Sequence, residues 1–273
     1  MFLSSLWKSA SRSRAAVPAN ISRKASRKRP QARRLRCEAL EDRRLLSFDP
    51  GWLVTAGGAG GSAGSNGVTA DSSGNLYTYG WFSGTVNFDP NGTCNLTSAG
   101  GNDAFVAKYS PTGSLLWARR IGSTGDEWAG SPVIDQFENV WFVAGFWSPT
   151  VDFDPLATHP GDTDILTNRG VRDIVVMRLD PNGNFLSVVQ EGGAANDNGG
   201  GMKLGPDGYV YQVATTESTT DFSVGSLVPT GSGNWVLTKF DPASGGSVVW
   251  TKRLGVNSHA GTVVGAKVAV DND

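Results

Sequence analysis

Short apolar segments separated by turn residues recur along the chain from about residue 57. In the first set, the segments 68–71, 76–82, 104–109 and 115–120 are rich in β-branched and aromatic residues. Clusters such as SSGN and SPTG lie between them, and Ser, Asn, Pro and Gly favour tight turns. The pattern predicts four strands joined as an antiparallel meander.

This pattern occurs three times. DAFVAKYSPTGSLLWARRIG at 103–122 is matched by DIVVMRLDPNGNFLSVVQEGG from Asp173 and NWVLTKFDPASGGSVVWTKRLG from Asn234, and the final AKVAVDND begins a fourth copy. Equivalent turns are 64, 70 and 66 residues apart, at Asp71, Asp135, Gly205 and Asp271. A period of this kind is the signature of a repeat architecture. The predicted units are 57–122, 123–192, 193–255 and a partial unit, 256–273.

The predicted strands are apolar on both faces. Phe105 and Tyr109 point to one side of the segment 103–109, while Ala104 and Val106 point to the other. A sheet with one solvent-exposed face alternates between apolar and polar residues, so these sheets need cover on both faces. The predicted fold class is all-β, a β-propeller-like array of four-stranded antiparallel blades. The extra length of each unit lies between its second and third strands, where we expect the longest loops.

Three complete units are fewer than the four to eight blades of an ordinary closed propeller. We therefore expect either a truncated chain or self-association through open blade edges, because unpaired strand edges favour association. Glycine supplies 36 of 273 residues, which agrees with many tight turns and little helix. The chain contains no run of eighteen apolar residues, so no membrane span is predicted.

Charge divides the chain into two parts. Residues 1–47 contain thirteen basic and three acidic residues, whereas the remainder contains eleven basic and twenty-two acidic residues. We expect a basic, disordered leader at 1–50 and folded repeats at 51–273. A solvated tail and a nucleic-acid-binding arm are alternative roles for the leader. Nucleic acid is the less favoured partner, because the body is acidic and no nucleic-acid-binding module follows.

One short motif in the leader indicates a destination. LEDRRLLS follows a long Arg-rich stretch and resembles the LEPR-x-LL type N-terminal signature of large exported proteins in planctomycete bacteria. Asp42 replaces the family's frequent Pro, and the matching residues are Leu40, Glu41, Arg43, Leu45, Leu46 and Ser47. The resemblance implies export to the cell envelope or the extracellular space, with processing near this motif.

The repeat also resembles a known family. DAFVAKYSPTGSLLWARRIG, together with the preceding GNLYTYG and TVNFDP, is similar to the bacterial SBBP-type β-propeller repeat over about residues 57–273. The units are unequal, because Asn234 and Trp235 replace the Asp-Ala of the motif and Ser187 stands where Trp117 and Trp250 stand. The resemblance implies a β-propeller in an extracytoplasmic setting and no known reaction.

A few residues are candidates for binding. Trp81, Phe82, Phe146 and Trp147 form two aromatic pairs that could stack on a sugar ring or a partner surface, although large aromatic residues also pack sheets together. His159 adds a polar candidate in the longest predicted loop.

Acidic residues in the related phrases TVNFDP and TVDFDP are candidate metal ligands. Calcium binds oxygen ligands of this kind, and Asp89, Asp152 and Asp154 could supply them. Turn formation is the simpler role for an aspartate next to proline. No other cofactor is predicted.

The sequence favours an exported, non-enzymatic protein that binds a protein or polysaccharide partner through its blade loops. The alternative is a propeller enzyme that acts on polysaccharide or uses a quinone cofactor, which rests on analogy of fold alone. An enzyme should show polar residues that are unique to one unit and converge with perturbed pKa values.

Overall fold

A computed structural model describes the chain at residues 56–58, 60–89, 91–154, 164–217, 220–222, 225–227, 233–256 and 268–270. These residues belong to one compact unit, Asp49–Asp273. Every regular element among them is a strand, so the prediction of an all-β chain is confirmed. In this described part, no helix is present that is long and apolar enough to cross a membrane.

Each repeat forms a four-stranded antiparallel sheet. The first sheet has the order β1-β2-β5-β6, with strands β1 (Ser62–Ala70), β2 (Leu76–Ser83), β5 (Asp103–Tyr109) and β6 (Leu115–Ile121). The second sheet is built from β7 (Glu127–Ile134), β8 (Val140–Phe146), β11 (Asp173–Leu179) and β12 (Phe185–Gly193). The third consists of β13 (Asp197–Leu204), β14 (Val210–Thr216), β17 (Asn234–Asp241) and β18 (Ser247–Val256).

The insertion between the second and third strands of each unit contains a small hairpin rather than only loop. These hairpins are β3 (Thr85–Asn87) with β4 (Asn95–Thr97), β9 (Thr150–Asp152) with β10 (Ile165–Thr167), and β15 (Thr220–Phe222) with β16 (Gly225–Leu227). The sequence predicted the longest loops here but not these hairpins, in which cross-strand pairs such as Val86 with Leu96 stabilise a short ladder. The third hairpin also pairs with the outer strand β12, which makes the second sheet six-stranded.

The hairpin turns explain the repeated Asp and Asn residues. Asp71 Oδ1 accepts hydrogen bonds from the backbone N–H groups of Ser73 and Asn75, at 3.1 and 2.8 Å. The same two bonds recur at Asp135 and at Asp180. The side-chain oxygen thus closes each turn, as aspartates in Asx-turns do.

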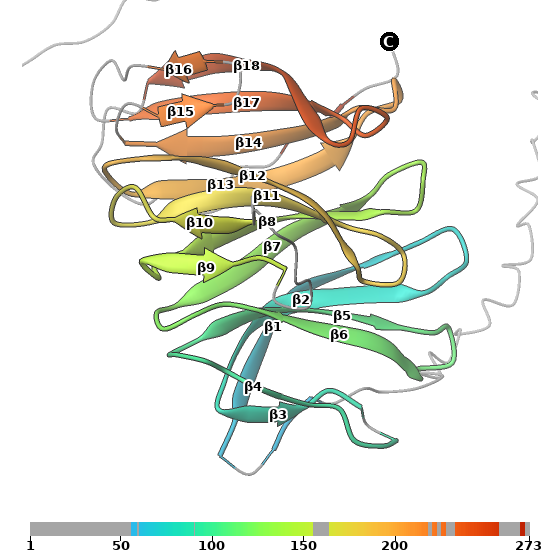
Figure 1. Cartoon of the computed structure of the whole chain (residues 1–273). Helices are drawn as coiled ribbons and strands as arrows, with labels where there is room; N and C mark the ends of the chain where they lie inside the picture. The colour runs from blue at the N-terminus through green and yellow to red at the C-terminus, as the bar shows by residue number, and fades with distance from the viewer. Residues whose placement is uncertain are drawn as a thin grey trace, which may run out of the picture. The chain divides into compact units, whose positions relative to one another are not determined.

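The three sheets stack one on another (Figure 1). The first strand of each following unit lies across the preceding sheet, because β7 packs against β1, β2 and β5, and β13 packs against β7, β8 and β11. Both faces of the middle sheet are therefore covered, which accounts for strands that are apolar on both sides. None of the described sheets closes on itself, and the propeller stays a prediction.

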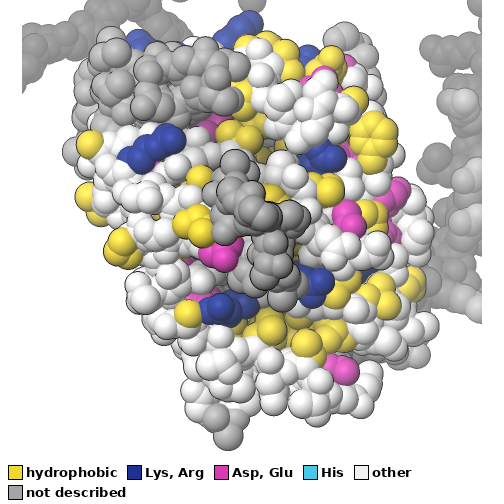
Figure 2. Space-filling view, in the orientation of Figure 1, with side chains coloured by type: hydrophobic (Ala, Val, Ile, Leu, Met, Phe, Trp, Pro, Cys, Tyr) yellow, Lys and Arg dark blue, Asp and Glu magenta, His cyan; other side chains and the backbone are white. Residues whose placement is uncertain are grey.

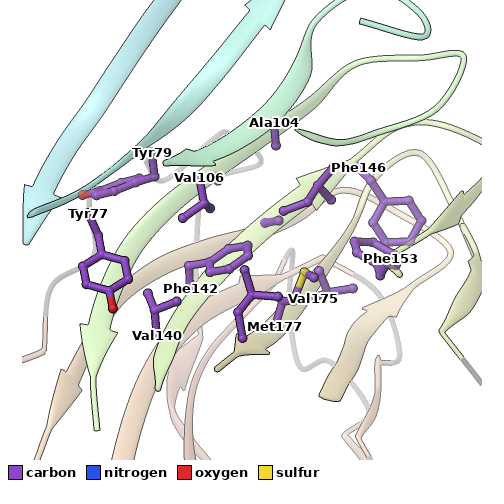
Figure 3. Close-up of a cluster of buried hydrophobic side chains, with 14 of the residues drawn as sticks. Tyr77, Tyr79, Ala104, Val106, Val140, Phe142, Phe146, Phe153, Val175 and Met177 are labelled. Atoms are coloured by element: carbon purple, nitrogen blue, oxygen red, sulfur yellow. The ribbon is translucent and has the colours of Figure 1, made fainter. Parts of the chain in front are cut away.

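The core between the first two sheets is made of apolar side chains from both. Tyr77, Tyr79 and Val106 from the first sheet face Phe142 and Val175 from the second (Figure 3). All five side chains are buried. Burial of this kind is the main force that holds one repeat against the next.

Candidate functional site

The four aromatic binding candidates lie in different environments. Phe82 and Phe146 are fully buried, and Phe146 packs edge-on against Phe153 with ring centroids 5.7 Å apart. Neither of these two rings has an exposed face for a ligand. Trp81 is half-buried, and Trp147 keeps 38% of its surface exposed. Trp147 is therefore the member of the set most open to a partner.

Trp147 is held in place by its surroundings. Its ring lies 4.6 Å from the guanidinium of Arg172, and Arg172 Nε donates a 2.8 Å hydrogen bond to the backbone oxygen of Asp197. The backbone N–H of Trp147 donates to the carbonyl oxygen of Asp126 at 3.0 Å. The indole is thus positioned before any partner arrives, which lowers the entropy cost of binding.

The acidic candidates form turns. Asp89 Oδ1 accepts a 3.0 Å bond from Asn91 N–H, and Asp152 Oδ1 accepts a 2.9 Å bond from Asp154 N–H. Within the described segments, no group of three or more His, Cys, Asp or Glu residues is placed to hold a metal ion. Calcium at Asp89, Asp152 and Asp154 stays a prediction.

Several predicted residues lie outside the described residues. His159 is one of them, in the second insertion between Asp154 and Asp164. The leader 1–50 is likewise outside, and with it the targeting residues Leu40, Glu41, Arg43, Leu45, Leu46 and Ser47.

One charged arrangement recurs in all three sheets. In the first sheet, Lys108 Nζ lies 3.1 Å from the Asp71 carboxylate and 4.8 Å from the Tyr77 ring centre. Burial by itself would raise the pKa of Asp71, but hydrogen bonds from Asn75 and Lys108 hold it below its usual value. In the second sheet the same positions are occupied by Asp135, Trp141 and Arg178. In the third sheet Tyr211 and Lys239 keep the positions of the ring and the cation, but Gly205 replaces the acid, and Asp207, two residues further along the turn, contacts both side chains.

These cations connect neighbouring sheets through the turns. Lys108 Nζ and Trp117 Nε1 both donate to the carbonyl oxygen of Pro181, at 3.2 and 3.0 Å. Pro181 belongs to the turn between β11 and β12 of the next unit. Arg178 Nη1 makes the same contact, at 3.3 Å, with the carbonyl oxygen of Pro242. The repeated cation and the repeated Asp-Pro turn therefore interlock consecutive repeats.

The interface between the first and second sheets is here called the first junction. Two buried carboxylates, those of Asp103 and Glu127, lie at its other end. Asp103 accepts 2.9 Å bonds from Arg120 and from the backbone N–H of Ala99. Glu127 accepts bonds from the N–H groups of Ser123 and Ser148, and burial raises its pKa. This junction combines two acids, one arginine and several backbone donors, so most of the charge is compensated.

The second junction, between the second and third sheets, is formed by the equivalent residues of the next units, and several of them are polar rather than apolar. Where the first junction has the apolar residues Ile121, Phe142, Phe146 and Met177, the second has Glu191, Gln212, Thr216 and Thr238. All four polar side chains are fully buried. Gln190 also replaces Arg120, so this junction gains an acid and loses a cation.

Burial dominates the ionisation of this polar group. It raises the pKa of Glu191 to about 7, with Thr238 and Gln212 lowering it in part and Asp197 raising it further. It also raises the pKa of Asp197 to about 7, and the N–H of Gly193 opposes this by donating a 2.8 Å bond. Neither oxygen of Glu191 makes a hydrogen bond of ordinary geometry to the described residues.

Glu191, Asp197 and Gln212, here called the Glu191 group, have two of the properties expected of an active site, since Glu191 and Gln212 are unique to one junction and both carboxyl groups have raised pKa values. The group lacks the third property, access for a substrate, because Glu191, Asp197 and Gln212 are all closed to solvent. The candidate residues chosen from sequence did not include this group. Aligning Glu191 with Ile121 and Leu254 would have revealed an acid in an apolar column.

No protein-family model and no curated protein matches the chain. The resemblance to SBBP-type repeats and to the planctomycete export signature therefore stays a prediction.

Proposed function

We propose that the chain is an exported, non-enzymatic repeat protein whose sheets are blades of a β-propeller and whose loops bind a protein or polysaccharide partner. The observation that carries this proposal is the exposed, pre-positioned indole of Trp147, directly after β8 and before the inserted hairpin. Loops on a rigid scaffold are common sites of recognition, and a fixed aromatic ring suits both sugar rings and protein surfaces.

Surface chemistry elsewhere agrees with a binding protein. Figure 2 shows hydrophobic side chains scattered among polar and charged ones on one face, rather than gathered in a broad patch. Recognition would then depend on single anchors such as Trp147 with polar loop atoms around them.

The test compares two exposed aromatic residues at opposite ends of β8. Trp147 follows the strand, and Phe137, with 51% of its surface exposed, precedes it in a hairpin turn. Binding of the full chain to a panel of cellulose, chitin, xylan and alginate, and to isolated envelope protein, is measured for W147A and F137A. We expect W147A to weaken binding at least tenfold and F137A to leave it unchanged. Equal binding by wild type and W147A would remove the basis of the proposal.

The competing function is a propeller enzyme acting on polysaccharide or with a quinone cofactor, and the Glu191 group is the observation in its favour. Its enclosure argues for a structural role. Assays for sugar release and for quinone-dependent dye reduction decide between the two, because activity that is lost in E191Q would favour the enzyme.

Export is proposed on the leader alone. Mass spectrometry of the mature N-terminus, after expression in a planctomycete host, tests it. A processed N-terminus near Ser47 in the secreted fraction supports export, and an intact leader in the cytoplasm contradicts it.

Self-association is proposed from the outer strands. Hairpin β15–β16 covers the edge of β12, whereas among the described strands none pairs with the outer edges of β6 and β18. These two strands also expose Leu116, Val249 and Leu254. Open apolar edges of this kind favour pairing with another chain. Sedimentation equilibrium of the full chain tests this, and a monomer at all concentrations contradicts it.

A further inference from the structure

The polar group of the second junction contains more acceptors than donors. Glu191 Oε1 and Oε2, Asp197 Oδ1 and Gln212 Oε1 are all closed to solvent and make no hydrogen bond of ordinary geometry to the described residues, although the side chains of Thr238 and Gln212 lie close enough to Glu191 to lower its pKa. Two donor atoms of the same junction, Gln212 Nε2 and Thr216 Oγ1, likewise make no hydrogen bond of ordinary geometry to the described residues, so these four oxygens still outnumber the free donors. Buried polar atoms are satisfied in the great majority of cases, so four such oxygens in one junction require a partner.

The three residues come from adjoining strands and face one another across the junction. Glu191 is paired with Ile174 in the second sheet, on the side that packs against the third sheet. Gln212 lies on the facing side of the third sheet, in register with Thr238. Asp197 is tied to the end of β12 through its bond with Gly193, two residues from Glu191.

Among the described residues, no Lys or Arg forms an ion pair with these carboxylates, although Arg172 interacts electrostatically with Asp197. At the first junction Arg120 forms an ion pair with Asp103, but its counterpart in the second unit is Gln190. Arg172 is the nearby cation, and its Nε donates to the backbone oxygen of Asp197 while its guanidinium stacks on Trp147. None of the ion pairs among the described residues includes Glu191 or Asp197. Two buried, unpaired carboxylates are strongly destabilising unless something compensates their charge.

We propose that Glu191, Asp197 and Gln212 bind one calcium ion between the second and third sheets. Two carboxylates carry the charge that a divalent cation neutralises, and all four free acceptors are oxygens, the ligand type that calcium requires. The group contains no His or Cys, which excludes the usual ligands of zinc. Calcium takes six to eight oxygen ligands, so water would supply those beyond the four protein oxygens. The ion would then hold the second and third sheets together, as apolar packing holds the first and second.

The binding test uses the full chain, stripped of metal by unfolding and refolding in EGTA at pH 8. Calcium is then added, and bound calcium is measured by equilibrium dialysis and atomic absorption. We expect one ion per chain and a rise of roughly 5 °C or more in the unfolding midpoint, because the ion binds the folded state alone. Wild-type chain that neither binds calcium nor becomes more stable with it would overturn the proposal.

Variants locate the ion. E191Q should lose the bound calcium while conserving side-chain size. E191I, which introduces the residue type of position 121, should remain folded, bind no calcium and show no calcium-dependent shift. D89N and D152N, which alter turn acids of the first and second insertions, should leave one bound ion. Calcium binding that survives E191I, or that disappears in D152N, would place the ion elsewhere and overturn this assignment.

Discussion

The ammonium group of Lys108 lies 3.1 Å from the Asp71 carboxylate, and both side chains are almost closed to solvent, with 7% and 4% of their surfaces exposed. In the third sheet Lys239, at the position of Lys108, pairs instead with Asp207, two residues after the position of Asp71; this pair is 3.0 Å apart but far more open, at 16% and 40%. The first pair is thus buried, and its lysine also donates to the Pro181 carbonyl oxygen of the next unit, whereas the second is a surface pair.

This difference predicts unequal costs for the same substitution. K108M leaves the Asp71 carboxylate buried without its cation and removes a donor from Pro181, so we expect a loss of about 3 kcal/mol in the free energy of unfolding. K239M should cost less than about 1 kcal/mol, because solvent screens an exposed pair. Urea denaturation of both variants checks the ranking, and equal losses would contradict it.

A second prediction concerns the turn that docks on Trp117. Gly183 has a φ of +80°, and a Cβ there would lie 2.8 Å from the Trp117 ring, whereas Gly74 has a φ of +79° and its nearest neighbour, Pro111, is 3.5 Å away. Alanine strains the backbone equally at both positions, at about 1 kcal/mol. G183A should lose a further 1–2 kcal/mol or so, because the turn must move off the ring. Thermal unfolding measures the difference, and equal losses would show that the junction tolerates the shift.

The glycines that end the repeated motif give a third prediction. A Cβ on Gly122 would lie 2.6 Å from Asp103 Cγ and 2.7 Å from Glu127 Oε2, whereas Gly255 has no atom within 4 Å of that position. G122A should therefore destabilise the chain by about 2 kcal/mol, by forcing two buried carboxylates apart from their donors. G255A is the matched control and should change stability by less than about 0.5 kcal/mol. A similar cost for both would mean that the loss does not come from the contact with the two carboxylates.

The fourth prediction is a pH dependence of stability in the presence of EGTA. Burial raises the pKa of Glu191 and that of Asp197 to about 7 in the folded chain, from ordinary values of 4.5 and 3.8. The folded state therefore binds protons more tightly than the unfolded state, and ionisation of these groups destabilises it. Stability should fall as pH rises from about 4.5 to about 7, by on the order of 1 kcal/mol per pH unit, and then level off.

The control for this pH profile is E191I, which removes one of the two titrating groups. Its stability should fall less steeply over the same range, and it should exceed wild type above pH 7 because the buried charge is gone. Chemical denaturation at half-unit pH intervals measures both profiles. Parallel slopes for wild type and E191I would show that Glu191 does not titrate in this range.

Strand positions were predictable where the chain itself carries the pattern. The predicted segments 76–82 and 115–120 correspond to β2 and β6 within one residue. The first strand begins at Ser62 rather than at 68, because its Gly- and Ser-rich start has no apolar pattern and is ordered by pairing with β2. The inserted hairpins were missed for a related reason, since three-residue strands are too short to show a period.

The choice among candidate binding residues needed the structure. Phe146 and Trp147 are adjacent and equally aromatic in sequence, yet one is fully buried and the other exposed, because neighbouring residues of a strand point to opposite faces and β8 ends between them. The Glu191 group could not be predicted from the sequence, for another reason. Its members come from β12, β13 and β14, and only the stacking of two sheets brings them together.

The sequence by itself determined the strands, the turns and the threefold repeat, because turn chemistry and apolar periodicity act over a few neighbouring residues. The tertiary structure alone decided which carboxylates are compensated and which are enclosed without a partner. Charge compensation depends on distances across two sheets, and residues that meet there are separated by tens of positions along the chain.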